Sequence, residues 1–311
     1  MEGIVTKSTG SWYDVRKQNG EIVPCRLRGL FRLKGSKNTN PVVVGDHVRF
    51  VIEADNSGYI TDIAPRKNYI DRKSTKLSKI NHLIAANIDL AFLVVTLREP
   101  KSSLGFIDRF LVAAEGFRIP AILLFNKMDI YTEEEKKIIG KIKEIYNAVG
   151  YKTVLCSTVT GEGIEEVKVL MQGKVSLFSG HSGVGKSAII NTIFPQLNLK
   201  IGEISSYHHK GKHTTTFAQM FPTGNDGFII DTPGIKEFGL IQYGKDEIRD
   251  YFPEIRAYNN CCRFNNCLHL HEPGCAVIQA VEEGEISTSR YYNYLAILED
   301  DDLKIADWEL L

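Results

Sequence analysis

The chain has 311 residues, of which 43% are hydrophobic, 10% aromatic and 24% charged, and 38 lysines and arginines balance 38 aspartates and glutamates. This composition excludes intrinsic disorder, which needs low hydrophobicity with high net charge. At roughly 100–200 residues per domain, the length predicts two or three domains. The sequence contains no apolar run of about 18 residues and opens without a basic-then-apolar leader, so we expect a soluble, cytoplasmic protein with no membrane contact.

Charge is unevenly distributed along the chain. Residues 1–80 carry a net charge of +7, residues 81–239 of +1 and residues 240–311 of −8. A basic segment attracts phosphate-rich partners such as RNA. A solvated surface with a few extra lysines explains the same charge, so both interpretations stay open.

Residues 1–68 predict a small β-barrel domain. Apolar and polar side chains alternate in short segments that Gly, Asn and Ser separate. A longer basic interruption at residues 28–40 suits an OB-fold barrel, and an SH3-like barrel is the alternative. Residues 69–87 are assigned to a linker, because residues 66–79 are polar and basic without periodicity. The strands are expected at residues 3–8, 11–16, 22–27, 46–52 and 59–63.

From residue 88 onward, apolar strands alternate with amphipathic helices, which is typical of a mostly parallel sheet covered by helices. We therefore predict an α/β domain over residues 88–239, followed by a mostly α-helical domain over residues 240–311. Strands are expected at residues 88–96, 121–125, 153–155, 175–179, 218–222 and 228–231, and helices at residues 107–115, 132–149, 163–171 and from 186.

A stretch that follows the strand at residues 175–179 fits the G-x-x-x-x-G-K-[ST] pattern of a phosphate-binding loop, the P-loop. Its backbone N–H groups and the following helix N-terminus would cradle the α- and β-phosphates. Lys186 would reach the β- and γ-phosphates, and Ser187 would ligate Mg²⁺. We expect an exposed, non-catalytic side chain at His181. The predicted nucleotide contacts here are Ser179, Gly180, His181, Ser182, Gly183, Val184, Gly185, Lys186 and Ser187.

The base is predicted from Asn126-Lys127-Met128-Asp129, which follows the strand at residues 121–125. The Asp129 carboxylate would accept from the N1–H and 2-amino groups of guanine, and it would reject adenine. Asn126 would tie this loop to the P-loop, and the stem of Lys127 would cover the base. Ser157 resembles the loop residue that touches guanine O6 in GTPases, so these residues predict GTP.

Two further segments complete the predicted set. Asp231 ends a strand before Thr-Pro-Gly, where it would hold Mg²⁺ through water while the Gly234 N–H meets the γ-phosphate. The polar loop at residues 210–216 is of switch I type, and one of its three threonines would cap Mg²⁺. The sequence does not choose among them, and we select Thr215.

The order of the motifs is unusual. In ordinary GTPases the P-loop precedes the Asn-Lys-x-Asp motif, whereas here it follows that motif. A circular permutation explains this order, and such a change is tolerated because domain termini usually lie close together at the surface. The sequence therefore predicts a circularly permuted GTPase.

The C-terminal region contains a C-x4-C-x-H-x5-C pattern formed by Cys262, Cys267, His269 and Cys275. In a cytosolic chain such a cluster indicates metal rather than disulfides. Three thiolates and an imidazole suit a closed, structural zinc site. Cys261 and His271 are competing ligands.

With these motifs, nearly the whole chain resembles the ribosome small subunit-dependent GTPase A family (RsgA, also called YjeQ). The resemblance implies an OB barrel, a permuted GTPase and a zinc domain whose ligands fall on Cys262, Cys267, His269 and Cys275, in place of Cys261 and His271. It also implies a cytoplasmic bacterial GTPase that binds the small ribosomal subunit and its rRNA late in maturation, near the decoding region. Turnover would be stimulated by that subunit. We expect a monomer with one structural Zn²⁺ and with Mg²⁺ bound alongside GTP or GDP.

Ile235 stands where Ras-like GTPases place the glutamine that orients the attacking water. An isoleucine cannot do this, so we predict slow intrinsic hydrolysis. Either His213 or a group from the ribosome would position the water, and an RNA or phosphate contact by His213 is equally open. The predicted catalytic residues are Lys186, His213, Thr215, Asp231 and Gly234.

Two other functions are considered. The chain could be a GTP-gated RNA-binding module in which hydrolysis is incidental. A P-loop enzyme that uses ATP is the other alternative, and Asp129 disfavours it.

Overall fold

The computed structural model describes residues 1–27, 41–73, 81–199, 218–231, 243–299 and 308. The chain forms two compact units that alternate along the sequence. One comprises Met1–Ala91, Val167–Phe178 and Ser187–Ile235, and the other comprises Phe92–Glu166, Ser179–Lys186 and Lys236–Leu311. The domain boundaries after residues 68, 87 and 239 stay predictions. Within the described residues, no helix is long and apolar enough to cross a membrane.

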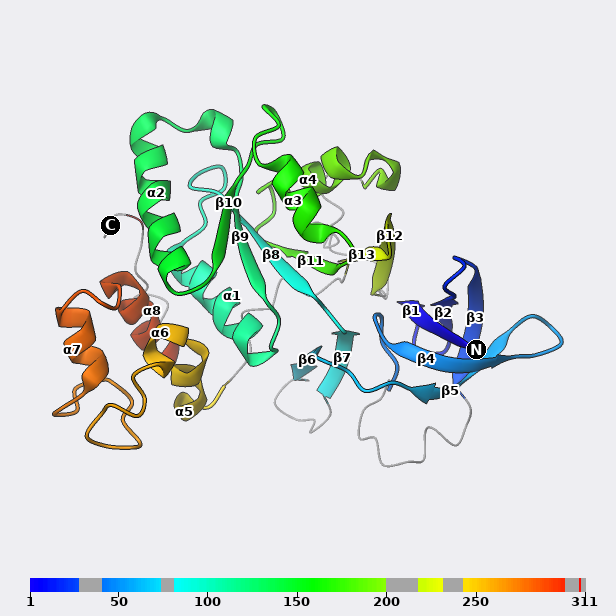
Figure 1. The fold of residues 1–311 in the computed structure, drawn as a ribbon, viewed down its shortest axis with the longest axis horizontal. Helices are drawn as coiled ribbons and strands as arrows, with labels where there is room; N and C mark the ends of the chain where they lie inside the picture. Colours follow the sequence, from blue (N-terminus) through cyan, green and yellow to red (C-terminus); the bar gives the residue numbers. More distant parts are fainter. Residues whose placement is uncertain (28–40, 74–80, 200–217, 232–242, 300–307, 309–311) are drawn as a thin grey trace, which may run out of the picture. The chain divides into compact units, whose positions relative to one another are not determined.

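The N-terminal strands form the predicted five-strand barrel (Figure 1). β1 pairs antiparallel with both β2 and β4, and β3 pairs parallel with β5, which closes the barrel. Alternate side chains, such as Val15, Phe50 and Ile60, fill its core. The strands are β1 (Glu2–Ser8), β2 (Tyr13–Arg16), β3 (Ile22–Leu27), β4 (His47–Ile52) and β5 (Gly58–Ile63).

The segment predicted as a linker contains a two-stranded antiparallel sheet of β6 (Tyr69–Lys73) and β7 (Asn81–Ala86). Two buried asparagines hold the flanking backbone. Asn68 Nδ2 donates to Ile88 O at 2.8 Å, and Asn87 Nδ2 donates to Gly45 O at 2.8 Å. Because polar groups organise this segment, it lacks the hydrophobic periodicity from which strands were predicted.

The α/β strands agree with the predicted pattern. In the first unit β11 (Val175–Ser179) runs parallel to β13 (Gly227–Asp231), and β12 (Gln219–Gly224) runs antiparallel to β13. β12 also pairs with β1 at Lys7 and Gln219. In the second unit β10 (Lys152–Leu155) runs parallel to β9 (Ala121–Phe125), which neighbours β8 (Leu90–Val95).

The helices of the α/β region also lie where the sequence predicts them. Ser103 caps α1 through the Phe106 N–H, and Thr132 and Glu135 form a capping box at the start of α2. The elements are α1 (Leu104–Gly116), α2 (Glu133–Ala148), α3 (Ile164–Met171), α4 (Lys186–Ile193) and the 3-10 turns η2 (Met128–Ile130) and η3 (Pro195–Leu197).

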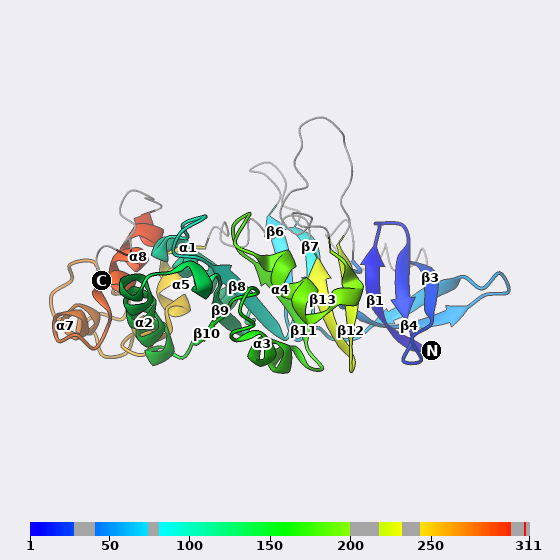
Figure 2. The same cartoon turned by 90° about the horizontal axis from the view of Figure 1, so that it is seen from above.

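The C-terminal region is built of short helices, as predicted. Phe252, Ile255 and Tyr294 are buried in its core, to which Val112 of α1 also belongs. Both views show α8 lying against α1 (Figure 2). The helices are α5 (Lys245–Ile248), η5 (Arg249–Tyr251), α6 (Pro253–Arg256), α7 (Ala276–Glu282) and α8 (Thr288–Glu299).

Candidate functional site

The predicted P-loop connects β11 to α4. Gly180, Gly183 and Gly185 adopt positive φ angles of 136°, 87° and 101°. A Cβ atom at Gly185 would lie 2.2 Å from Asn126 Nδ2, so only glycine fits there. Lys186 Nζ donates to the carbonyl oxygens of Gly180 at 2.7 Å and of His181 at 2.8 Å. The side chain of Lys186 is thus folded over the loop.

The remaining P-loop positions differ in exposure. Ser179 at the end of β11 and Ser187 in the first turn of α4 are buried, as is Val184. Ser182 and Gly183 are exposed at the tip of the loop. Backbone groups, the Ser182 hydroxyl and the His181 imidazole therefore make up the exposed rim of this loop.

Asn126 joins the predicted base-binding loop to the P-loop. Its side chain is buried directly after β9, and its Nδ2 donates to the Val184 carbonyl oxygen at 2.8 Å. The two motifs lie 58 residues apart in sequence. The structure thus brings them together through the residue from which the sequence predicts this contact.

Asp129 lies exposed in η2 and accepts a hydrogen bond from Ser157 Oγ at 2.5 Å. The buried Ser157 oxygen in turn accepts from the backbone N–H groups of Val159 at 3.1 Å and Thr160 at 3.2 Å. The sequence assigns Ser157 to guanine O6, whereas in this structure its hydroxyl orients the Asp129 carboxylate. One carboxylate oxygen of Asp129 is thereby held in place, and the carboxylate can accept hydrogen bonds from a base.

Two contacts around these loops involve residues that sequence reasoning missed. Lys127 Nζ donates to the carbonyl oxygen of Glu99. Phe106 of α1 stacks on His181 of the P-loop, with ring centroids 3.9 Å apart and planes inclined by 26°. His181 is exposed, as predicted, but partial desolvation and the Lys186 charge lower the pKa of its imidazole. Both missed residues follow β8, so their place after a strand of the α/β sheet was the available signal.

Several predicted residues lie outside what the structure describes. His213, Thr215 and Gly234 belong to this group, and so does Ile235. The backbone of Asp231 ends β13 opposite Gln219, but its side chain is not among the described ones. Their roles in catalysis and in magnesium binding stay predictions.

The C-terminal cluster has the geometry of a metal centre. One ligand atom from each of Cys262, Cys267, His269 and Cys275 lies within 4.8 Å of the others. His269 Nδ1 is 3.5 Å from Cys262 Sγ and 3.4 Å from Cys275 Sγ, and these two sulfurs are 4.0 Å apart. Tetrahedral zinc, with bonds of about 2.3 Å to sulfur and about 2.0 Å to nitrogen, needs ligand separations of roughly 3.5–3.8 Å. The four side chains can therefore hold such an ion.

A chain of hydrogen bonds orients the imidazole of this cluster. His269 Nε2 lies 3.2 Å from Asn259 Oδ1, and Asn259 Nδ2 donates to Asp250 Oδ1 at 2.6 Å. With Nε2–H donating to Asn259, Nδ1 keeps its lone pair for a metal. Burial lowers the pKa of His269, which favours the neutral ring that a ligand requires. Cys261 and His271 are both exposed and do not belong to the cluster.

The loop that carries these ligands is fixed by Glu272. Its carboxylate accepts from the backbone N–H groups of Leu268 and Leu270 at 2.7 Å and of His271 at 3.1 Å. Burial alone would raise the pKa of Glu272, but these amides hold it at about 2. The carboxylate is therefore charged at neutral pH and acts as a permanent acceptor.

The family model for the RsgA GTPase matches residues 63–241, and the model for the RsgA N-terminal domain matches residues 2–60. The chain belongs to the RsgA GTPase family. A protein from Bacteroides fragilis named small ribosomal subunit biogenesis GTPase RsgA is 51% identical over 300 residues, which cover 96% of this chain and 97% of that protein. A relative with the same name from Christiangramia forsetii is 50% identical over 305 residues, or 97% of each chain.

Two solved structures confirm the fold. YjeQ from Thermotoga maritima aligns with a TM-score of 0.78 at 35% identity, over 96% of this chain and 98% of that one. YloQ, described as a circularly permuted GTPase, aligns with a TM-score of 0.75 at 29% identity, over 98% of this chain and 96% of that one. The predicted N-terminal barrel and permuted GTPase are thereby confirmed, and the C-terminal region has the predicted cysteine–histidine cluster that could hold a metal ion.

Proposed function

We propose that this chain is a cytoplasmic GTP hydrolase that binds the small ribosomal subunit and assists its maturation. The observation that carries the proposal is the hydrogen bond from Asn126 to Val184, which joins a guanine-type motif to a P-loop in a member of the RsgA GTPase family. Relatives that cover almost the whole chain are named for small ribosomal subunit biogenesis. We further propose that the protein acts as a monomer.

The proposed loops divide phosphate binding and Mg²⁺ binding between them. The P-loop backbone and Lys186 bind the phosphates, while Ser187, Thr215 and Asp231 hold Mg²⁺. Lys186 Nζ already lies over the loop, bonded to two of its carbonyl oxygens. A bound phosphate is a stronger acceptor than these carbonyls, so the ammonium is expected to turn toward it.

Base selection is assigned to Asp129, and substitution by asparagine tests this. The variant amide can donate, so it suits xanthine, which carries a carbonyl where guanine carries the 2-amino group. We expect Asp129→Asn to lose at least a hundredfold in GDP affinity relative to xanthosine diphosphate. The control is Asp226→Asn, in the exposed β12–β13 turn. Unchanged guanine preference in the Asp129 variant, measured by competition binding, would exclude this role.

The hydrolysis step needs a group that the chain lacks at residue 235. An isoleucine there cannot orient water, so turnover of the isolated protein should be slow. His213 or a group on the ribosomal subunit is proposed to supply this function. His213→Ala should abolish subunit-stimulated turnover while GTP affinity stays within about twofold, and unaltered stimulated turnover would leave the subunit as the source.

Contact with rRNA is assigned to the barrel. The Arg26 guanidinium lies over the Trp12 ring, 3.9 Å from its centroid, and Arg26 is exposed. Stacked aromatic and guanidinium groups suit unpaired bases, and basic side chains suit phosphates. Trp12→Ala should weaken binding to small subunits about tenfold at fixed salt. Ile22→Ala, exposed on the same barrel, is the matched control.

A further inference from the structure

Helix α1 carries a charged side chain that is completely buried. Nine of its 13 residues are buried, and Asp108 is the charged one among them. Its partner is Arg290 of α8, which is only 1% exposed and whose Nη1 donates to Asp108 Oδ1 at 2.5 Å. The two residues are 182 positions apart in sequence. The contact therefore links the α/β region to the C-terminal helices.

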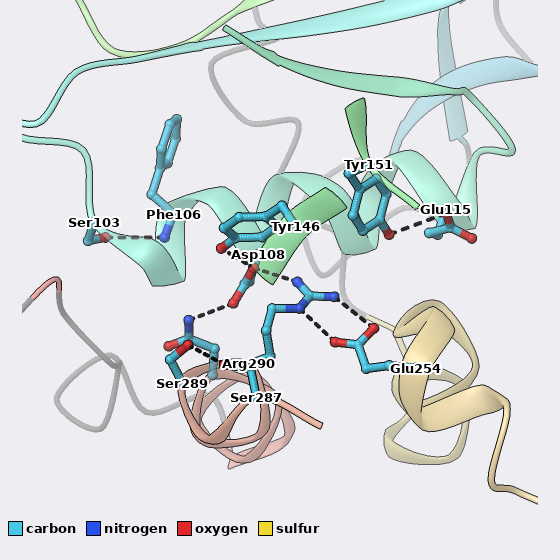
Figure 3. Close-up of polar contacts among 11 residues, drawn as sticks. Ser103, Phe106, Asp108, Glu115, Tyr146, Tyr151, Glu254, Ser287, Ser289 and Arg290 are labelled. Carbon is cyan, nitrogen blue, oxygen red and sulfur yellow. Dashed lines mark hydrogen bonds and ion pairs between the residues drawn. The ribbon is translucent and has the colours of Figure 1, made fainter. Parts of the chain in front are cut away.

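The partners of this ion pair come from α2, α6 and α8 itself, all in the second unit (Figure 3). Arg290 donates to both carboxylate oxygens of Glu254 in α6, at 2.6 Å and 3.1 Å. Asp108 also accepts from Tyr146 Oη at 2.7 Å and from Asn293 Nδ2 at 2.6 Å. Burial raises the pKa of Asp108, and Arg290 and the two neutral donors oppose that rise. We call Asp108, Tyr146, Glu254, Arg290 and Asn293 the buried cluster.

Burying these charged groups costs desolvation free energy, so the cluster adds little net stability to the packing of the helices. Desolvation of two carboxylates and a guanidinium cancels much of their attraction, and apolar side chains of similar size often bind helices as strongly. What the charges add is selectivity for one arrangement, because a shift of α8 against α1 would separate the buried Asp108 carboxylate from Arg290 and Asn293 and leave it without an opposite charge. The buried cluster thus favours rigid attachment of the C-terminal helices to α1.

Each of the two helices, α1 and α8, also contacts a candidate site. On α1, Phe106 lies two residues before Asp108 and stacks on His181 of the P-loop. On α8, Tyr291 and Tyr294 donate to the backbone oxygens of His269 and Leu268, each at 2.6 Å. These carbonyls belong to the loop that carries the metal ligands. A continuous set of contacts therefore runs from the P-loop through α1 and α8 to the metal centre.

We propose that α1 is a coupling helix, through which nucleotide binding at the P-loop and the position of the metal-binding C-terminal helices influence each other. This inference rests on the proposed function, because it takes the P-loop as a nucleotide site. It assigns Asp108, Arg290 and Glu254 as positioning residues rather than catalytic ones. Coupling of this kind is reciprocal, so a partner held by the C-terminal helices would alter nucleotide affinity by the same factor.

Hydrogen exchange of the full-length, metal-loaded protein with and without GDP tests the proposal. If opening of α8 disturbs the P-loop, GDP at 100 times its dissociation constant slows exchange in α8 by up to about a hundredfold, and without coupling it has no effect there. We expect slowing of about tenfold or more in α8 and α6. Strands β2 and β3 of the barrel are the internal reference. Equal slowing in those strands would overturn the proposal, because the effect would then belong to the whole fold.

Two variants sharpen the test. Glu254→Gln keeps the shape and one acceptor for Arg290, and Asp108→Asn removes the central charge. Each should reduce the GDP effect on α8 at least threefold while GDP still protects the P-loop. The matched control is Arg256→Gln, which removes an exposed ion pair to Glu115 at 3.3 Å between the same two helices, α6 and α1. That control should keep the full effect.

The outcomes separate the two proposals. If GDP leaves exchange of the P-loop itself unchanged, the proposed function fails. If GDP protects the P-loop but not α8 in the unmodified protein, the coupling fails and the proposed function stands. The unmodified protein alone decides this, so the test holds even where a variant does not fold.

Discussion

The N-terminal barrel and the C-terminal helical region are stabilised in different ways. In β3 and β4, buried and exposed residues alternate strictly, and β1 closes the barrel against β4. The C-terminal helices α5 and α6 have only four residues each, which is too short to be stable alone. Beside its apolar core, the C-terminal region holds a cluster of three cysteines and a histidine, and Arg290 of α8 is buried against Asp108.

The two regions differ in how strongly their folding depends on a bound metal ion. A barrel of alternating strands forms from backbone pairing and apolar burial, with no added component. Short helices around a ligand cluster gain much of their stability from the metal. Metal removal, core truncation and surface substitution should therefore affect the two regions unequally.

The largest expected effect follows metal removal. Structural zinc contributes on the order of 10 kcal/mol to folding of small domains, so a chelator should unfold the region around residues 243–299 and leave the barrel intact. Limited proteolysis would show this, with added Zn²⁺ restoring resistance and Mg²⁺ as the control ion. A C-terminal region that stays resistant without metal would contradict the account.

Truncation of a core side chain in the barrel should instead destabilise the barrel. Phe50 is 1% exposed, and Phe50→Ala should cost about 3–5 kcal/mol through lost burial and a cavity. Its neighbour Val51 is 52% exposed, so Val51→Ala should change stability by less than about 0.5 kcal/mol. Urea unfolding followed at the barrel measures both. Equal losses for the two variants would mean that the alternation does not define the core.

A smaller effect is expected around the metal. Asn259→Ala removes the acceptor that orients His269, and such losses typically weaken metal affinity about 10–100-fold, or about 1.4–2.7 kcal/mol. Asn266→Ala, exposed in the same loop, is the control. Competition with a chromophoric chelator gives the affinities. If both variants bind Zn²⁺ as the unmodified protein does, Asn259 has no orienting role.

We expect the smallest effect on stability from a substitution at the surface of the barrel. Lys17 and Glu21 form an ion pair at 3.0 Å in which the Glu21 side chain is 55% exposed. Solvent and side-chain entropy offset such pairs, so Lys17→Ala should change the free energy of unfolding by less than about 0.5 kcal/mol. A loss above about 1 kcal/mol in urea unfolding would show that surface charge contributes to barrel stability after all.

The same contrast governs what the sequence could predict. The strand at residues 22–27 was predicted with the bounds of β3, because alternation and turn residues are local signals. The cysteine–histidine cluster was also predictable, since the spacing of its residues is short and chemically distinctive. Asn126 was assigned its contact with the P-loop because two motifs of known mechanism imply it.

The buried cluster was not predictable in this way. Asp108 is one of two acidic residues in a mostly apolar helix, and no local pattern connects it with Arg290 so far along the chain. The β6–β7 pair was missed for a related reason, because side-chain hydrogen bonds from Asn68 and Asn87 leave no periodic pattern. Long-range polar pairing depends on three-dimensional position, which spacing alone does not encode.

The most direct test of the proposed function is steady-state GTP hydrolysis by the purified protein, measured alone, with small subunits and with large subunits over a range of salt concentrations. We predict slow turnover for the protein alone and a rise of about a hundredfold or more with small subunits only, which fades as the salt concentration increases. Equally fast turnover without subunits, or equal stimulation by large subunits, would contradict it.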